Sequence, residues 1–169
     1  MRNRHLSFVL SITCLFCAIA TLAFAQSPST PEERSRFVAI AHKLESSPLD
    51  ESLRSEREWA LKWLIQVPDI HVSLCSSVLG DYFKFKYSSE LTVQLSLSQG
   101  AFVIEHPEQA SDQREQYFAG AEGALKAYSA ILQQKPKAKF KMLDELVAKQ
   151  ASGQLKSFVE AAAAKGCNK

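Results

Sequence analysis

The most regular hydrophobic pattern in the chain lies between Ser111 and Gln134. Apolar residues recur there every three or four positions, which places them on one stripe of an α-helix. The stripe consists of Phe118, Ala121, Leu125, Tyr128 and Leu132. A second stripe holds the small residues Gly120, Ala124 and Ala127, and small side chains let a second helix approach closely. The pattern predicts a long helix that packs against a neighbour and ends before Pro136, because the residue before proline is pushed out of helical geometry.

Further helices are predicted at 31–46, 50–66, 136–153 and 155–166 from the same three-to-four spacing. The first has the best start signal. Thr30 is suited to cap it, Pro31 suits the first helical position, and Glu33 completes a capping box. Phe37, Ile40, Ala41 and Leu44 supply its buried stripe. The sequence therefore predicts an all-α protein: one single-domain bundle of six or seven helices.

Residues 70–98 are ambiguous. Apolar and polar residues alternate there, as in YFKFKY at 82–87, and a period of two is typical of strands. Asp69 and Ser88 are nevertheless good starts for two helices, the first ending at Gly80 and the second before Pro107. We favour helices on both sides of a short extended piece at 82–87, with a small hairpin as the alternative.

The first 25 residues have the pattern of a secretory signal peptide. Arg2 and Arg4 precede an apolar run from Leu6 to Leu22, and Ala23-Phe24-Ala25 is a small-x-small cleavage site. We expect the mature domain to span 26–169 and to be periplasmic or secreted. The alternative is an uncleaved anchor, because the apolar run approaches the length that spans a bilayer. After cleavage we expect no stable membrane span.

Removal of this segment makes the charge balance neutral. The full chain has 20 basic and 18 acidic residues, and the segment carries two arginines and no acid, so 18 of each remain. Nucleic-acid binding thereby loses its compositional support. The C-terminal part is basic, with its densest run at Lys135, Lys137, Lys139 and Lys141. These lysines are either a solvated connection between helices or a docking patch for an anionic partner.

Two cysteines remain in the mature chain, Cys75 and Cys167. An even number in an exported protein predicts a disulfide. The bridge would close a loop of about 92 residues, for which the chain-entropy model gives about 4 to 5 kcal/mol. A structural role is favoured over a redox role because the mature chain has no Cys-x-x-Cys; intermolecular pairing is the alternative.

Aromatic residues are the candidate ligand-binding groups. Trp59 and Trp63 lie one turn apart and are able to touch, and Tyr82 and Phe85 belong to the dense YFKFKY cluster. A pocket among these four would suit a small-molecule or lipid carrier. Aromatic residues more often form core, and we favour that interpretation for both pairs.

The motifs of common enzyme and metal sites are missing from the sequence. It has no Gly-x-Ser-x-Gly, no His-Glu-x-x-His, no phosphate-binding glycine loop and no EF-hand loop. Glu105-His106 is the most site-like dipeptide, but one acid and one histidine specify no reaction. We therefore predict no catalytic residues, no metal and no cofactor, and keep a hydrolase that uses this dipeptide as a remote alternative.

The chain has a predicted signal peptide, a helical pattern and paired cysteines, together with YFAGAEGAL at 117–125 and the closing segment 155–167. In these features it resembles small exported bacterial proteins of uncharacterised function. Residues 70–167 are similar to HdeA-like helical periplasmic proteins, a group that includes acid-stress chaperones. This resemblance implies a binding protein without a cofactor. Together with the divided charge, it leads us to expect a non-enzymatic protein that binds or protects another envelope or secreted protein.

Overall fold

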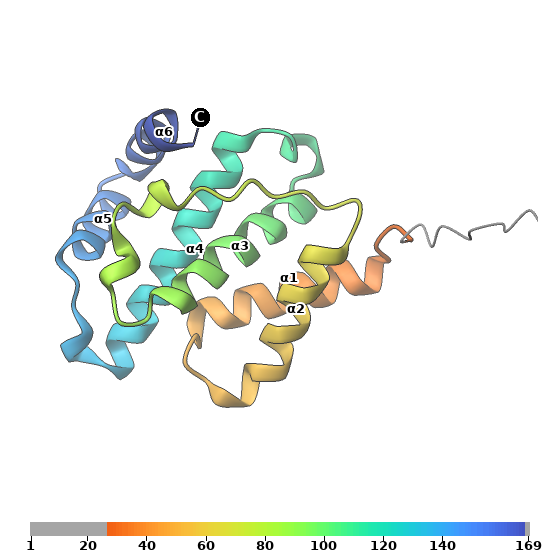
Figure 1. Ribbon diagram of the computed structural model, residues 1–169, viewed down its shortest axis with the longest axis horizontal. Coiled ribbons are helices and arrows are strands. Elements are labelled where there is room, and N and C mark those ends of the chain that lie inside the picture. Colours follow the sequence, from red (N-terminus) through yellow and green to blue (C-terminus); the bar gives the residue numbers. More distant parts are fainter. Residues whose placement is uncertain (1–26, 168–169) are drawn as a thin grey trace, which may run out of the picture.

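The computed structural model describes residues 27–167, and within them every regular element is a helix. The predicted all-α fold is confirmed, with six α-helices connected by short 3-10 turns (Figure 1). The α-helices are α1 (Pro31–Ser46), α2 (Arg54–Gln66), α3 (Ser88–Glu105), α4 (Gln113–Gln134), α5 (Lys141–Ala151) and α6 (Leu155–Gly166). The 3-10 turns are η1 (Glu51–Leu53), η2 (Ser76–Leu79), η3 (Tyr82–Lys84), η4 (Pro107–Gln109) and η5 (Pro136–Ala138). The predicted signal peptide, residues 1–25, lies outside the described residues.

Helix α1 begins as its sequence predicts. The backbone N–H of Glu33 donates to Thr30 Oγ1 at 3.2 Å, and the backbone N–H of Thr30 donates to Glu33 Oε2 at 2.9 Å. This reciprocal capping box satisfies donors that a helix start otherwise leaves unpaired. All four predicted apolar positions of α1, from Phe37 to Leu44, are buried.

Helices α3 and α4 form the centre of the molecule and lie side by side (Figure 1). Their close contact depends on glycine. A Cβ added to Gly120 of α4 would lie 2.9 Å from the backbone oxygen of Leu95 on α3, which is closer than side chains normally approach. Gly120 belongs to the predicted small-residue stripe of α4, and the neighbour that this stripe admits is α3.

Helix α3 separates two hydrophobic clusters. Leu91 and Leu95 face the larger cluster, which α4, α5, α6 and the η2–η3 region complete. Leu97 and Ala101 face the smaller cluster, which α1 and α2 complete. Because α3 has a core on two sides, it is buried from Gln94 to Ala101 without interruption. Within residues 27–167, no helix is both long and apolar enough to cross a bilayer.

The connection from α2 to α3 differs from the prediction. The expected helix from Asp69 to Gly80 is wrong: residues 70–75 are extended, and only the short turn η2 follows. The carboxylate of Asp69 does not cap a helix because it accepts hydrogen bonds from Ser29 and Arg34 instead. Residues 82–87 form the turn η3 and a second turn rather than an extended piece, and no hairpin occurs in the described residues.

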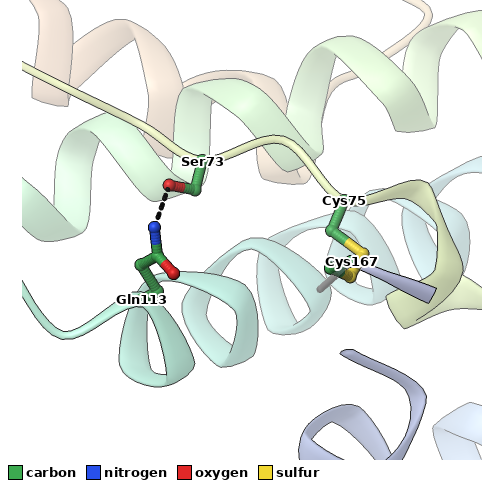
Figure 2. Close-up of a disulfide and its surroundings, with 4 residues drawn as sticks. All are labelled: Ser73, Cys75, Gln113 and Cys167. Carbon is green, nitrogen blue, oxygen red and sulfur yellow. Dashed lines mark hydrogen bonds between the residues drawn. A yellow bond between two sulfur atoms is a disulfide. The ribbon is translucent and has the colours of Figure 1, made fainter. Parts of the chain in front are cut away.

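Side chains of α4 hold this extended segment in place. The backbone N–H of Ser73 donates to Gln116 Oε1 at 3.2 Å, and Gln116 Nε2 donates to the carbonyl of His71 at 3.4 Å. Gln113 donates to the hydroxyl of Ser73 at 3.0 Å (Figure 2). The buried amide of Gln116 thus replaces the hydrogen bonds that a helix or sheet would supply to this backbone.

The predicted disulfide between Cys75 and Cys167 is confirmed (Figure 2). The two Cα atoms are 5.7 Å apart, within the usual range for a bridge. Cys75 is buried and Cys167 is half-buried. The bond connects the end of α6 to the segment that precedes η2, so it ties the last helix to the middle of the chain.

Candidate functional site

The four predicted lysines lie on the connection between α4 and α5. Lys135, Lys137, Lys139 and Lys141 are all exposed. None of them forms an ion pair with a carboxylate among residues 27–167. Their charges are therefore directed to solvent or to a partner.

Two of these lysines border a cleft that the sequence alone did not reveal. We call it the lysine cleft; it has a volume of about 450 Å³ and is lined by Lys86, Tyr87, Gln134, Lys135, Pro136, Lys137 and Ala138. Lys86 and Tyr87 lie in the turn directly before α3, about 50 residues earlier in the chain. The ring of Tyr87 and the apolar atoms of Pro136 and Ala138 supply its non-polar surface. No carboxylate lines it, and Lys139 and Lys141 lie outside it.

A buried tyrosine fixes the connection that carries these lysines. The hydroxyl of Tyr128 on α4 donates to Asp144 Oδ1 at 2.6 Å and accepts from the backbone N–H of Phe140 at 2.9 Å. Burial, followed by the hydrogen bond to Asp144, raises the pKa of Tyr128 to about 12. The hydroxyl therefore remains protonated at any physiological pH and ties the start of α5 to α4.

The four aromatic candidates lie in two different places. Trp59 and Trp63 are half-buried beside the smaller cluster, where their rings stack with centroids 5.9 Å apart. The guanidinium of Arg36 covers the Trp59 ring at 3.8 Å. Tyr82 and Phe85 are buried in the larger cluster, with Tyr82 only 1% exposed. The structure does not bring the two pairs together.

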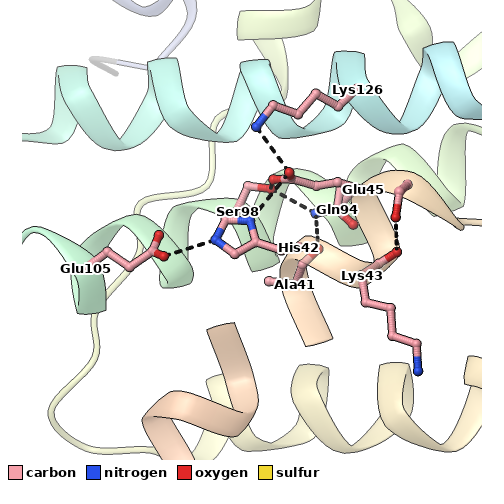
Figure 3. Close-up of polar contacts among 9 residues, drawn as sticks. Ala41, His42, Lys43, Glu45, Gln94, Ser98, Glu105 and Lys126 are labelled. Atoms are coloured by element: carbon pink, nitrogen blue, oxygen red, sulfur yellow. Dashed lines mark hydrogen bonds and ion pairs between the residues drawn. The ribbon is translucent and has the colours of Figure 1, made fainter. Parts of the chain in front are cut away.

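A polar cluster between α1, α3 and α4 was missed in the sequence. We call it the Glu45 cluster: His42, Glu45, Gln94, Ser98, Glu105 and Lys126 (Figure 3). The side chain of Glu45 is only 10% exposed. Its Oε1 accepts from Ser98 Oγ at 3.0 Å, and its Oε2 accepts from Lys126 Nζ at 3.1 Å. A buried carboxylate needs such partners, because an unpaired charge in the interior is very costly.

The imidazole of His42 lies between two carboxylates of this cluster. Its Nε2 is 3.0 Å from Glu105 Oε1, and its Nδ1 is 3.5 Å from Glu45 Oε2. Burial acts to lower the pKa of His42, but the hydrogen bond and charge of Glu105, with the charge of Glu45, outweigh it and raise that pKa. The side chain is 47% exposed, so solvent screens these interactions.

The Glu105-His106 dipeptide does not converge on a common site. Glu105 pairs with His42, whereas His106 Nδ1 lies 3.8 Å from Glu108 Oε1. Within the described residues, no three His, Cys, Asp or Glu side chains are grouped as metal ligands. The dipeptide thus belongs to two separate ion pairs rather than to one reaction centre.

Comparison with known proteins adds no functional information. No family model, curated protein or solved structure matches this chain. The similarity to HdeA-like proteins stays an expectation from the sequence.

Proposed function

We propose that this protein is exported and that it binds, without catalysis, an acidic segment of another envelope or secreted protein in the lysine cleft. One observation carries the proposal. Lysines from two distant parts of the chain, Lys86 together with Lys135 and Lys137, border one cleft that has an apolar surface and no carboxylate. If the lysines were only a solvated connection between helices, they would need neither to meet at one cleft nor to border an apolar surface.

The chemistry of the cleft specifies its occupant. Three ammonium groups attract carboxylates, and the half-buried ring of Tyr87 with Pro136 offers contact to an apolar side chain. An exposed lysine–carboxylate pair contributes only about 0.2 to 1 kcal/mol. Three such pairs contribute about 0.6 to 3 kcal/mol, so with one small apolar contact they support only weak binding, with a Kd of roughly 1 mM or higher. Because the charges are exposed, the affinity should fall steeply with added salt.

A labelled peptide tests this function directly. The probe is an acidic peptide with one central leucine, titrated against the mature protein by fluorescence anisotropy at low and at physiological salt. Charge reversal at the three cleft lysines (Lys86→Glu, Lys135→Glu, Lys137→Glu) should abolish binding.

The matched control changes three exposed lysines that do not line the cleft: Lys62→Glu, Lys139→Glu and Lys141→Glu. It makes the same change in net charge and should weaken binding only slightly. Equal losses in the two triple variants would show general electrostatic attraction and contradict a role for the cleft. Tighter binding of a fatty-acid anion than of the peptide would instead assign the alternative function, a carrier of anionic amphiphiles.

A further inference from the structure

A second cleft lies beside the Glu45 cluster and is independent of the lysine cleft. Its volume is about 400 Å³, and it is formed by the end of α1, the C-terminal half of α4 and one residue of α5. We call it the Glu45 cleft; it is lined by His42, Glu45, Ser46, Lys126, Ser129, Ala130, Gln133 and Gln150. Glu45 is its only carboxylate and also its most buried polar side chain.

The two oxygens of Glu45 have different environments. Oε1 faces inward, where Ser98 donates to it and where a Cβ on Gly123 would approach within 2.8 Å. Oε2 receives its hydrogen bond from Lys126, whose side chain is 55% exposed and reaches across from α4 (Figure 3). The inner oxygen is thus held by the fold, whereas the outer one is held by two groups nearer the surface, the ammonium of Lys126 and Nδ1 of His42 at 3.5 Å.

The hydroxyl groups of the cleft offer acceptors rather than donors. Ser46 donates its proton to the carbonyl of Lys43 at 3.0 Å, and Ser129 donates to the carbonyl of Leu125 at 2.9 Å. A hydroxyl has one donor and two acceptor positions, so only acceptor positions remain on both. Helix α1 also ends at Ser46, where its dipole places partial negative charge.

We propose that the Glu45 cleft binds a primary alkylammonium group, in the position that the ammonium of Lys126 occupies. Such a group has three N–H donors, and the cleft offers it the outer oxygen of Glu45 together with the hydroxyl oxygens of Ser46 and Ser129 in its lining. Gln133 lies about two turns beyond Lys126, or about 10 Å along α4. With Gln150 it offers amide oxygens to a second amino group at the other end of a linear diamine. Lys126 is then a tethered competitor that keeps Glu45 paired when the ligand is absent.

Removal of the competitor provides the test. Lys126→Met keeps an unbranched stem and removes the ammonium. Binding of 1,6-diaminohexane is measured by calorimetry at about pH 9, because the pKa of His42 is raised above its ordinary value of about 6.5 and a protonated imidazole beside Glu45 would compete with the ligand. We expect Lys126→Met to bind the diamine up to about fivefold more tightly than the wild-type protein, since an ion pair of up to about 1 kcal/mol no longer competes. Diamine should also raise the Tm of the variant, by an amount that grows with the logarithm of ligand concentration once the Kd is exceeded.

Two controls separate a site from general charge attraction. Glu45→Gln in the Lys126→Met background should remove binding, because the carboxylate is lost at nearly constant shape. Tetramethylammonium has the same charge as one ammonium group but no N–H donor, and it should not bind. N-acetyl-lysine amide distinguishes the source of the ammonium: tighter binding than the diamine indicates a lysine of a partner protein, and weaker binding indicates a free diamine.

Several results would overturn the proposal. These are equal diamine affinity in the wild-type protein and Lys126→Met, retained affinity in the double variant, or equal binding of tetramethylammonium. Circular dichroism establishes that each variant is folded. If Lys126→Met does not fold, Lys126→Ala replaces it in the same comparison. The proposal also requires that the single variant Glu45→Gln bind the diamine less tightly than the wild-type protein does.

Discussion

The substitution Gln99→Met should stabilise the protein. Gln99 lies on α3 where that helix contacts α4, is fully buried, and has no hydrogen-bond partner for either polar atom of its amide within residues 27–167. Gly120 of α4 packs tightly against its stem, since a Cβ on Gly120 would approach Gln99 Cγ within 2.8 Å. Methionine keeps the unbranched shape of glutamine and has no strong polar group.

The size of the effect follows from what the amide lacks. A buried donor or acceptor without a partner costs about 1 to 3 kcal/mol, whereas an apolar group of the same shape has no such cost. The rotamer entropies of the two side chains are similar, so they nearly cancel. We therefore expect an increase of about 1 to 3 kcal/mol in the free energy of unfolding. For a domain of this length that is a rise in Tm of roughly 3 to 10 °C.

Urea and thermal unfolding followed by circular dichroism measure this difference, with Gln116→Met as the matched control. Gln116 is also a buried glutamine, but its amide bonds to the backbone of Ser73, His71 and Ala110. The control should destabilise by about 1 to 3 kcal/mol, because it leaves those groups unpaired. Equal destabilisation by both substitutions would refute the reasoning, since it would mean that the Gln99 amide is hydrogen-bonded in the folded protein.

Three other predictions concern stability. Gly123→Ala should lower the Tm, at a cost of about 1 to 3 kcal/mol, because its Cβ would collide with the Ser98 side chain; an unchanged Tm would contradict this close contact. Urea unfolding of the double variant Cys75→Ser, Cys167→Ser should show a loss of up to about 4 to 5 kcal/mol, and a negligible loss would mean that the bridge hardly limits the unfolded chain. Since the pKa of His42 is raised, its stabilising effect is complete below about pH 6.5 and fades as pH rises through the folded-state pKa. The loss in free energy of unfolding caused by His42→Gln should therefore shrink over that interval, by less than about 1 kcal/mol.

Local signals explain what the sequence predicts well. The capping box at Thr30, the proline after it and the stripe from Phe37 to Leu44 act within single turns of one helix, and all of them form as expected. The disulfide was predictable for another reason. Only two cysteines follow the predicted signal peptide, so only one pairing exists within the mature chain.

Non-local contacts explain what the sequence does not predict. Asp69 has the residue type and position of a helix cap, but Ser29 and Arg34, 35 to 40 residues away, occupy its carboxylate. The segment that follows is extended because Gln116 on α4 satisfies its backbone. The sequence of residues 69–80 by itself does not indicate that Ser29 and Arg34 bind Asp69 or that Gln116 binds the segment after it. A hydrogen bond to a distant side chain here overrides a sound local signal.

The candidate sites show the same limit. The lysine run was visible as composition, but the cleft needs Lys86 and Tyr87, which the α3–α4 contact brings beside it. Glu45 looks like ordinary surface charge in the sequence of α1. It is buried because Ser98 and Gly123 stand opposite it on two other helices. Serine and glycine carry little chemical signal by themselves, so nothing local marks that site.

The alternation that resembled strands in α3 has a physical origin of its own. A helix with one buried face shows a single apolar stripe, but α3 contacts a core on two sides and a polar layer between them. Its polar residues Gln94 and Ser98 are one turn apart and face α1, where Gln94 donates to the carbonyl of Ala41 and Ser98 to Glu45. Val93 and Leu95 flank Gln94, and Leu97 precedes Ser98, so the stretch from 91 to 98 reads as a period of two. On a central helix, that period marks contact with several partners rather than a strand, and the buried polar positions indicate which neighbour each face meets.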